Sequence, residues 1–275
     1  MKLLLLTLTF GLSFTSISYS KANSTIKGDD SFFNETHLSI LKQYFSDSII
    51  TELEACMYLF QSVRTDKDMS AAYEKAVGVR DKLINESYEH DPYEMMMDLG
   101  SVDSVLIGFR SDCVAECTEF NYTFFLPDLL DLAKKTKGEL DNQFFELMIM
   151  AYGEYGGQAY YWMEFFERFG DYVGSSTLGD SLAFDFLKAS WELSKKTDMF
   201  DDHIKAVREG CIRYMEHDSY MHSKEKVNLE IKRILSSNIL SKEEIDKITA
   251  ILKRNESGEE KIQYDCLHMD CDFDY

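Results

Sequence analysis

The fold class is indicated first by one segment, Ser48-Ile49-Ile50-Thr51-Glu52-Leu53-Glu54-Ala55-Cys56-Met57-Tyr58-Leu59-Phe60. Four of its apolar residues recur at steps of four, three and four, which is one face of an α-helix; they are Ile49, Leu53, Cys56 and Phe60. The whole chain of 275 residues contains only 2 prolines and 14 glycines. Because long helices exclude these residues while sheets and turns use them heavily, the sequence predicts an all-α fold.

The helical pattern continues on both sides of this segment. We expect further helices over residues 67–88, from Pro92 towards Ile107, and over 110–120, 127–137, 140–169, 181–196, 199–216, 220–235 and 241–253. Ser241 and Glu244 have the spacing of a capping box, which places the start of the last helix. About ten helices would form either a bundle or a short α-solenoid of helical hairpins. Residues 131–136 resemble residues 192–197, as repeated hairpins of a solenoid would, and chance similarity between two helix C-termini explains the resemblance equally well.

The N-terminus has the pattern of a secretory signal peptide. Lys2 precedes an apolar run from Leu3 to Phe14, and small residues follow before Lys21. We therefore expect a signal peptide over residues 1–20, a disordered segment over 21–34, a helical domain over 35–254 and an acidic C-terminal tail over 255–275. The protein is expected to be exported, either to a periplasm or outside the cell.

The charge of the chain limits its partners. It contains 49 acidic and 29 basic residues, for a formal net charge of -20. Such a chain repels phosphate backbones and anionic membrane surfaces, which argues against nucleic-acid binding and favours a basic protein as partner. After the leader, no stretch approaches the roughly 18 consecutive apolar residues of a membrane helix, so we expect no membrane span.

Six cysteines in an exported chain indicate disulfide bonds. If residues 110–120 are helical, Cys113 and Cys117 lie one turn apart, about 5 to 6 Å between Cβ atoms, which is too far for an unstrained bond between them. We therefore expect Cys56 and Cys211 to be their partners. Cys266 and Cys271 would close on each other in the tail.

A soft metal site is the alternative for the tail. Its ligands would be Cys266, His268, Met269 and Cys271, a set that suits copper(I) or zinc. Oxidation of the cysteines outside the cytoplasm would remove the thiolates that such a site needs. We therefore assign neither a metal nor a cofactor.

Two groups of residues are candidates for binding. Tyrosine and tryptophan are favoured at protein interfaces, which singles out Tyr155, Tyr160 and Trp162 in an aromatic run. The second group is His217, Asp218 and His222, whose histidines converge only if the helix breaks near Asp218.

No catalytic motif is present, and we assign no catalytic residue. The sequence favours an exported acidic helical protein that acts by protein–protein binding, as an inhibitor or immunity-type binder of a basic partner. The alternatives are a secreted hydrolase whose site assembles from scattered histidines and carboxylates, and a metal or small-ligand carrier.

Overall fold

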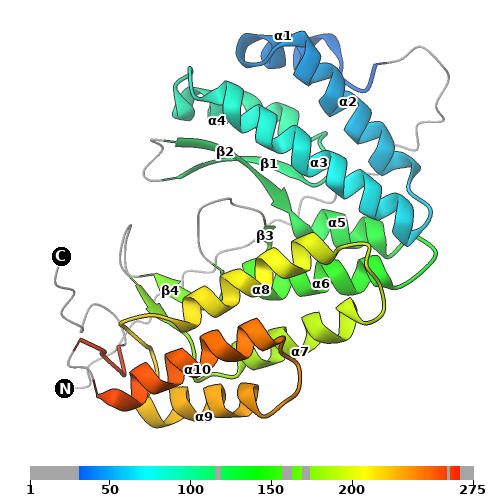
Figure 1. The fold of residues 1–275 in the computed structure, drawn as a ribbon. Coiled ribbons are helices and arrows are strands. Elements are labelled where there is room, and N and C mark those ends of the chain that lie inside the picture. Colours follow the sequence, from blue (N-terminus) through cyan, green and yellow to red (C-terminus); the bar gives the residue numbers. More distant parts are fainter. Residues whose placement is uncertain (1–30, 115–118, 157–162, 169–173, 259–260, 267–275) are drawn as a thin grey trace, which may run out of the picture. The chain divides into compact units, whose positions relative to one another are not determined.

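Helices dominate the chain, and a small sheet accompanies them (Figure 1). The computed structural model describes residues 31–114, 119–156, 163–168, 174–258 and 261–266. Its helices are α1 (Glu35–Tyr44), α2 (Asp47–Ser62), α3 (Asp66–Ser87), α4 (Pro92–Asp103), α5 (Leu126–Ala133), α6 (Leu140–Tyr152), α7 (Leu182–Ser194), α8 (Asp201–Met215), α9 (Lys224–Leu235) and α10 (Lys242–Ser257). Its strands are β1 (Phe109–Val114), β2 (Glu119–Phe125), β3 (Tyr155–Gly156), β4 (Phe166–Arg168) and β5 (Gly174–Ser176). The predominance of about ten helices is confirmed, whereas the all-α class is corrected by these strands.

Side-chain caps explain where several helices begin. A short polar side chain accepts a hydrogen bond from a backbone N–H of the first turn, which would otherwise have no partner. Ser46 does so for α2, Thr65 for α3 and Asp91 for α4. Ser241 and Glu244 form the complete capping box of α10, as the sequence predicted.

The helix expected over residues 110–120 is wrong, because β1 and β2 form an antiparallel hairpin there. Phe109 lies opposite Phe124, and Ser111 lies opposite Tyr122. The stretch Phe120-Asn121-Tyr122-Thr123-Phe124 is rich in aromatic residues and alternates with period two, which favours a strand. All five residues are buried, since helices cover this part of the sheet. Strand β3 adds to the free edge of β2.

The long helix expected over residues 140–169 ends early, at Tyr152. Gly153 follows with φ of 66°, a left-handed conformation that favours glycine and turns the chain out of the helix. Gly156 then lets β3 approach α5, since a Cβ there would lie 2.5 Å from a methyl carbon of Leu126. The glycines in the middle of this apolar stretch therefore stop a helix.

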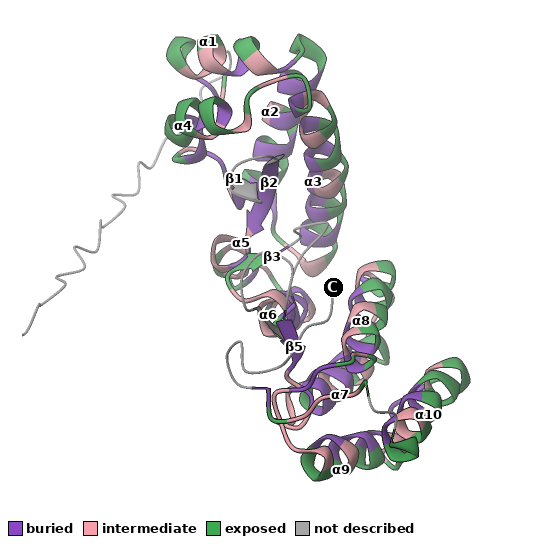
Figure 2. Ribbon diagram, turned by 90° about the vertical axis from the view of Figure 1, so that its left-hand side faces the viewer, coloured by how far each residue is buried: buried purple, intermediate pink, exposed green. Residues whose placement is uncertain are grey.

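Aromatic side chains form much of the core of the unit from Phe32 to Tyr275. Helices α3 and α4 both contact the β1–β2 hairpin, and α2 packs on α3. Tyr73 of α3 lies within 5.4 Å of the ring centres of Phe124, Phe144 and Phe145. Phe144 of α6 stacks on Phe200 at 4.0 Å. Figure 2 shows the buried faces of these elements turned towards one another.

The two boundaries predicted for the helical domain fall inside packed structure. Phe33 is only 2% exposed, although it lies in the segment expected to be disordered. Helix α10 extends to Ser257, and Gln263 beyond it exchanges backbone hydrogen bonds with Asp218 and Tyr220. Part of the predicted acidic tail is therefore bound to the segment between α8 and α9.

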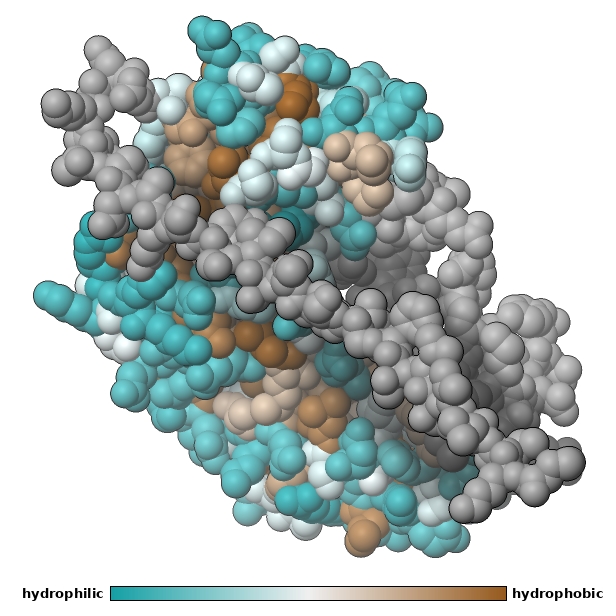
Figure 3. All heavy atoms as spheres, turned by 180° about the vertical axis from the view of Figure 1, so that it is seen from behind, coloured by the Kyte–Doolittle hydropathy of each residue, from teal (hydrophilic) through white to brown (hydrophobic). Residues whose placement is uncertain are grey.

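The described surface is largely hydrophilic on the face seen in Figure 3, with separate apolar patches between the polar side chains. In the part of the chain that the structure describes, every helix is too short or too polar to cross a lipid bilayer.

Candidate functional site

Side chains of α7, α8 and α10 line a groove of about 690 Å³. Figure 1 shows where these three helices lie. This volume is in the range of small-molecule and peptide sites. Four apolar side chains line it, namely Trp191, Ile204, Ile212 and Ile251. Ser194 and Ser241 also line it, together with six carboxylates and four basic groups, namely Asp201, Asp202, Glu209, Glu216, Glu243, Glu244, Lys205, Arg208, Arg213 and Lys247.

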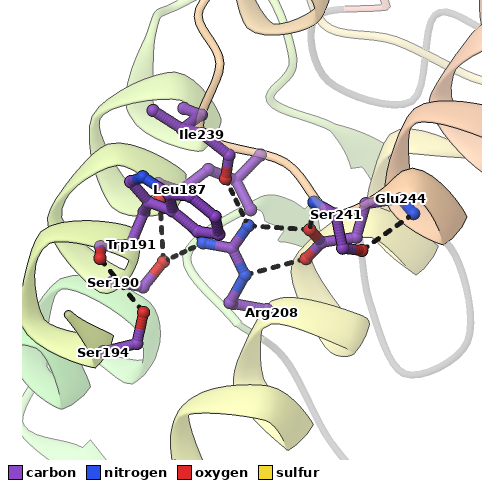
Figure 4. Close-up of polar contacts among 8 residues, drawn as sticks. All are labelled: Leu187, Ser190, Trp191, Ser194, Arg208, Ile239, Ser241 and Glu244. Atoms are coloured by element: carbon purple, nitrogen blue, oxygen red, sulfur yellow. Dashed lines mark hydrogen bonds and ion pairs between the residues drawn. The ribbon is translucent and has the colours of Figure 1, made fainter. Parts of the chain in front are cut away.

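Arg208 of α8 binds three separate segments at the base of this groove (Figure 4). It is 7% exposed. Its Nη1 donates to the carbonyl oxygen of Leu187 at 2.8 Å and to Ser190 Oγ at 2.6 Å, both on α7. Its Nη2 donates to the carbonyl oxygen of Ile239 at 2.9 Å, ahead of α10. Nε and Nη2 also bind the two carboxylate oxygens of Glu244 at 2.8 and 3.0 Å.

These bonds use every N–H that a guanidinium can donate. Burial raises the pKa of Glu244, but the hydrogen bonds from Arg208 and from Ser241 outweigh it and hold that pKa below its usual value. The same Glu244 carboxylate also accepts from the backbone N–H of Ser241 at 2.7 Å in the capping box. Arg208 and Glu244 therefore hold α7, α8 and α10 together, and Arg208 has no N–H left for a ligand.

Charged side chains on the outer walls of the groove also have oppositely charged neighbours. Lys247 and Glu243 form an ion pair of 2.8 Å on α10. Across the groove, Lys205 attracts Glu243 and Glu209 attracts Lys247. Residues 200–258, which contain most of the groove, carry 11 acidic and 11 basic residues. The groove thus lies in a stretch of the chain with no net charge.

The acidic excess of the protein lies elsewhere, in residues 83–167. That stretch contains 17 acidic residues and only 4 basic ones. Between Lys82 and Arg110 there are six carboxylates and no Lys or Arg. Four of the six are exposed on and just before α4: Glu89, Asp91, Glu94 and Asp98. Figure 2 shows that α4 turns a largely exposed face to solvent. We refer to these four residues as the α4 carboxylates.

Two of the α4 carboxylates have a structural contact as well. Asp91 accepts from the backbone N–H of Glu94 at 2.9 Å and begins the helix. Asp98 accepts from the hydroxyl of Tyr44 on α1 at 2.5 Å. Burial and the bond to Asp98 raise the pKa of Tyr44 to about 12, so this hydroxyl keeps its proton and remains a donor. Neither contact neutralises the negative charge of the surface.

His217, Asp218 and His222 lie between α8 and α9, where the chain does leave the helix at Met215. His217 is partly buried, which lowers its pKa, and its Nδ1 lies 3.1 Å from the backbone nitrogen of Ser219. Asp218 pairs with Arg254 at 3.2 Å. His222 packs against Gly179, where a Cβ would come within 2.8 Å of the histidine. Each residue thus has its own local contact, and their role in binding stays a prediction.

The described part of the chain contains no candidate metal cluster. Groups of three or more His, Cys, Asp or Glu side chains arranged to hold a metal ion do not occur there. The hydroxyls of Ser175 and Ser219, near His217 in the fold, bind each other at 2.5 Å.

Tyr155 lies at the surface, with 51% of its side chain exposed. Its backbone pairs with Phe125 through β3, and the two rings lie 5.3 Å apart. Tyr160 and Trp162 lie outside the described residues. The proposed binding role of all three is therefore untested.

The cross-links expected for Cys56 and Cys211 are wrong, because both are free thiols with no exposed surface. Burial raises the pKa of Cys56 to about 12. Cys113 lies on β1 opposite Phe120, so the helical spacing that excluded a bond to Cys117 does not apply. Cys266 is in a disulfide bond. Cys117 and Cys271 lie outside the described residues, and the structure does not identify the cysteine to which Cys266 is bonded, so the expected bond to Cys271 stays a prediction.

The sequence predicted neither the groove nor the α4 carboxylates as a group. A signal existed for both. Asp201, Lys205, Glu209 and Arg213 alternate in sign at intervals of four residues, the spacing of neighbours on one helix face. The absence of basic residues between Lys82 and Arg110 is equally visible in the sequence.

No protein-family model matches this chain, and searches of curated proteins and of solved structures find no match either.

Proposed function

We propose that this chain is an exported acidic protein that acts by binding another protein, as an inhibitor or immunity-type binder of a basic partner. The binding surface is the acidic region of residues 83–167, with the α4 carboxylates as its main contacts. The observation that carries this proposal is the uneven distribution of charge, with 17 acidic and 4 basic residues in that region against 11 of each in residues 200–258.

Electrostatics gives the physical reason. A surface with one sign of charge steers an oppositely charged partner during diffusion and repels partners of its own sign. Charges that already form ion pairs contribute less, because their field is cancelled at short range. This argument favours the α4 carboxylates over the groove, where Arg208 and Lys247 pair with Glu244 and Glu243. Tyr155 lies in the same acidic region and stays a candidate contact.

The test is purification of the tagged full-length chain from its own source, without reduction, followed by native mass spectrometry. Two variants with the same change of net charge are compared. One carries Glu89→Lys and Glu94→Lys next to α4, and the other carries Glu209→Lys and Glu216→Lys at the groove. All four side chains are exposed.

We expect a bound protein with a basic isoelectric point, retained at 0.05 M salt and released at about 0.5 M, because added salt screens exposed charges. The α4 variant should reduce the retained amount by about tenfold or more, and the groove variant by less than about twofold. Recovery of the chain alone, or of an acidic partner, contradicts the proposal. Loss of the partner only in the groove variant would move the site to the groove.

A further inference from the structure

The outer face of α4 carries an exposed apolar strip that the interior of the protein does not use. Tyr93 is 55% exposed and Met97 is 61% exposed, and their separation of four positions places both side chains on one face of the helix. Tyr88, at the end of α3, is 64% exposed and lies five residues before Tyr93. These are among the most exposed large apolar side chains of the described residues.

The inner face of α4 packs into the core of the protein. Met95, Leu99 and Val102 are fully buried, and α4 contacts α1, β1 and β2. Tyr93 and Met97 point away from these contacts, so folding does not account for their exposure. Exposed tyrosine and methionine together are typical of the centres of protein interfaces.

The strip continues past Met97 with small residues. Gly100, Ser101 and Ser104 are all exposed, and a Cβ added at Gly100 would meet no atom within 4 Å. From Tyr93 to Ser104 the strip spans 11 helical steps, or roughly 16 Å at 1.5 Å per residue. Large side chains at one end and small ones at the other leave room for a second helix to approach the backbone of α4 closely.

The charges beside the strip restrict what covers it. The α4 carboxylates flank it, and neither Lys nor Arg occurs between Lys82 and Arg110. Tyr44 donates to Asp98 on α4, and the ring of His90 lies 5.3 Å from that of Tyr44. Arg110 contacts the far end of the helix, where its Nη1 donates to the carbonyl oxygen of Asp103 at 3.3 Å. A second copy of this chain would bring the same carboxylates against each other, which is destabilising.

We propose that the strip Tyr93, Met97, Gly100, Ser101 and Ser104, together with Tyr88, is a docking surface for a positively charged amphipathic α-helix of another protein. The proposal rests on the acidic binding surface proposed above and adds the form of the partner. The apolar face of the incoming helix covers Tyr93 and Met97. Its Lys and Arg side chains reach the α4 carboxylates beside the strip.

The test uses two synthetic peptides of the same composition with the full chain in its unreduced form. One is an 18-residue peptide whose leucines share one helical face and whose lysines occupy the other. The second has the same residues in scrambled order. Fluorescence anisotropy of the labelled peptide gives the affinity, and peroxide oxidation of Met97, relative to Met221, reports whether the strip is covered.

Two variants locate the contact. One combines Tyr93→Ala and Met97→Ala. The matched control combines Leu229→Ala and Ile245→Ala, which removes exposed apolar side chains from α9 and α10. All four side chains are exposed, so both variants should fold, which circular dichroism confirms directly.

We expect the amphipathic peptide to bind at least tenfold more tightly than the scrambled one and to slow oxidation of Met97 by fivefold or more. The α4 variant should lose at least tenfold in affinity and the control less than twofold. Equal binding of the two peptides, with no effect of the α4 variant, overturns the helix-docking proposal but leaves the acidic surface intact. Binding of neither peptide at 0.05 M salt overturns both proposals. If the chain self-associates and the α4 variant abolishes that association, the strip binds a second copy of the chain and the helix-docking proposal is overturned.

Discussion

The groove between α7, α8 and α10 and the surface of α4 use charge in opposite ways. In the groove, the buried Arg208 meets Glu244 at 2.8 Å, and the exposed Lys247 meets Glu243 at the same distance. Around α4, four exposed carboxylates have no basic residue near them in sequence. The groove is hollow, yet Arg208 and Glu244 at its base pair with each other and hold three helices together. The electrostatic potential that a partner would feel is therefore expected to come from the surface of α4.

The two regions also stabilise a buried carboxyl group differently. Glu244 keeps its charge because Arg208 supplies the opposite one, and its pKa is lowered. Asp141 lies in the acidic region, has no exposed surface and has Asp66 rather than a base beside it. Burial and the hydrogen bond with Asp66 raise the pKa of Asp141 to about 6. Where no base is available, the buried carboxyl group instead keeps its proton up to a higher pH than usual.

The largest expected effect comes from removing the central cation of the groove. Arg208→Ala leaves the partly buried Glu244 without its partner and removes the hydrogen bonds to Leu187, Ser190 and Ile239. Breaking a buried pair in this way lowers the free energy of unfolding by about 3 to 5 kcal/mol. Urea unfolding of the wild-type protein and the variant measures this loss. Arg213→Ala, an exposed basic residue on the same helix, should cost under about 1 kcal/mol. Similar losses in the two variants would contradict the structural role of Arg208.

The next effect concerns pH and the acidic region. Because the pKa of Asp141 is raised in the folded protein, this group stabilises the fold below about pH 4, and its contribution is lost as the pH rises through about 6. We expect about 2 to 3 kcal/mol of unfolding free energy to disappear over that range. Asp141→Asn should remove this dependence, whereas Asp131→Asn, at an exposed site on α5, should keep it. Parallel profiles for all three proteins, from urea unfolding at a series of pH values, would contradict the assignment.

A smaller effect is expected at the free thiols, one on α2 and one on α8. Cys56→Ala removes one buried sulfur atom and should lower the free energy of unfolding by about 1 to 2 kcal/mol, less than the loss of a disulfide. Iodoacetamide should label Cys56 and Cys211 only after unfolding, because burial raises the pKa of both thiols. Peptide mapping of the unreduced protein measures this. Recovery of either cysteine in a cross-linked peptide would restore the pairing expected from sequence.

The smallest effect is expected around α4. Glu89→Gln with Glu94→Gln removes two exposed charges that form no ion pair in the described structure, so the unfolding free energy should change by less than about 0.5 kcal/mol. Thermal unfolding at low and high salt checks this. A loss of 2 kcal/mol or more would show that these carboxylates serve folding, and the contrast between the two regions would fail.

The sequence predicted the helices best where amphipathic periodicity and a cap coincide. Helix α10 has both, with Ser241 and Glu244 at its start and Ile248 and Ile251 buried. Prediction failed at the β1–β2 hairpin, where a short segment containing Cys113, Cys117 and Phe120 fits the helical spacing by chance. It failed again after Tyr152, where the apolar and aromatic residues follow no single period and fit a helix or a strand equally well.

The candidate sites follow the same division. Composition alone determined the acidic excess, and its concentration in residues 83–167 can be counted from the chain. The sequence did not predict that Cys56 and Cys211 are free thiols, because disulfide formation depends on which helices pack with their cysteines next to each other. The role of Arg208 could not be read either, since its partners lie 18 to 36 residues away in sequence.

By itself, the sequence determined the helical character, the helix starts with local caps and the sign of the charge, because these depend on neighbouring residues and on composition. Only the tertiary structure decided which charges are cancelled and which apolar side chains remain uncovered. Arg208 finds Glu244 across two helices, whereas Tyr93 and Met97 stay exposed because the inner face of α4 already fills the contact with α1 and the hairpin. Both outcomes depend on contacts between residues far apart in the chain, and local sequence patterns do not specify such contacts.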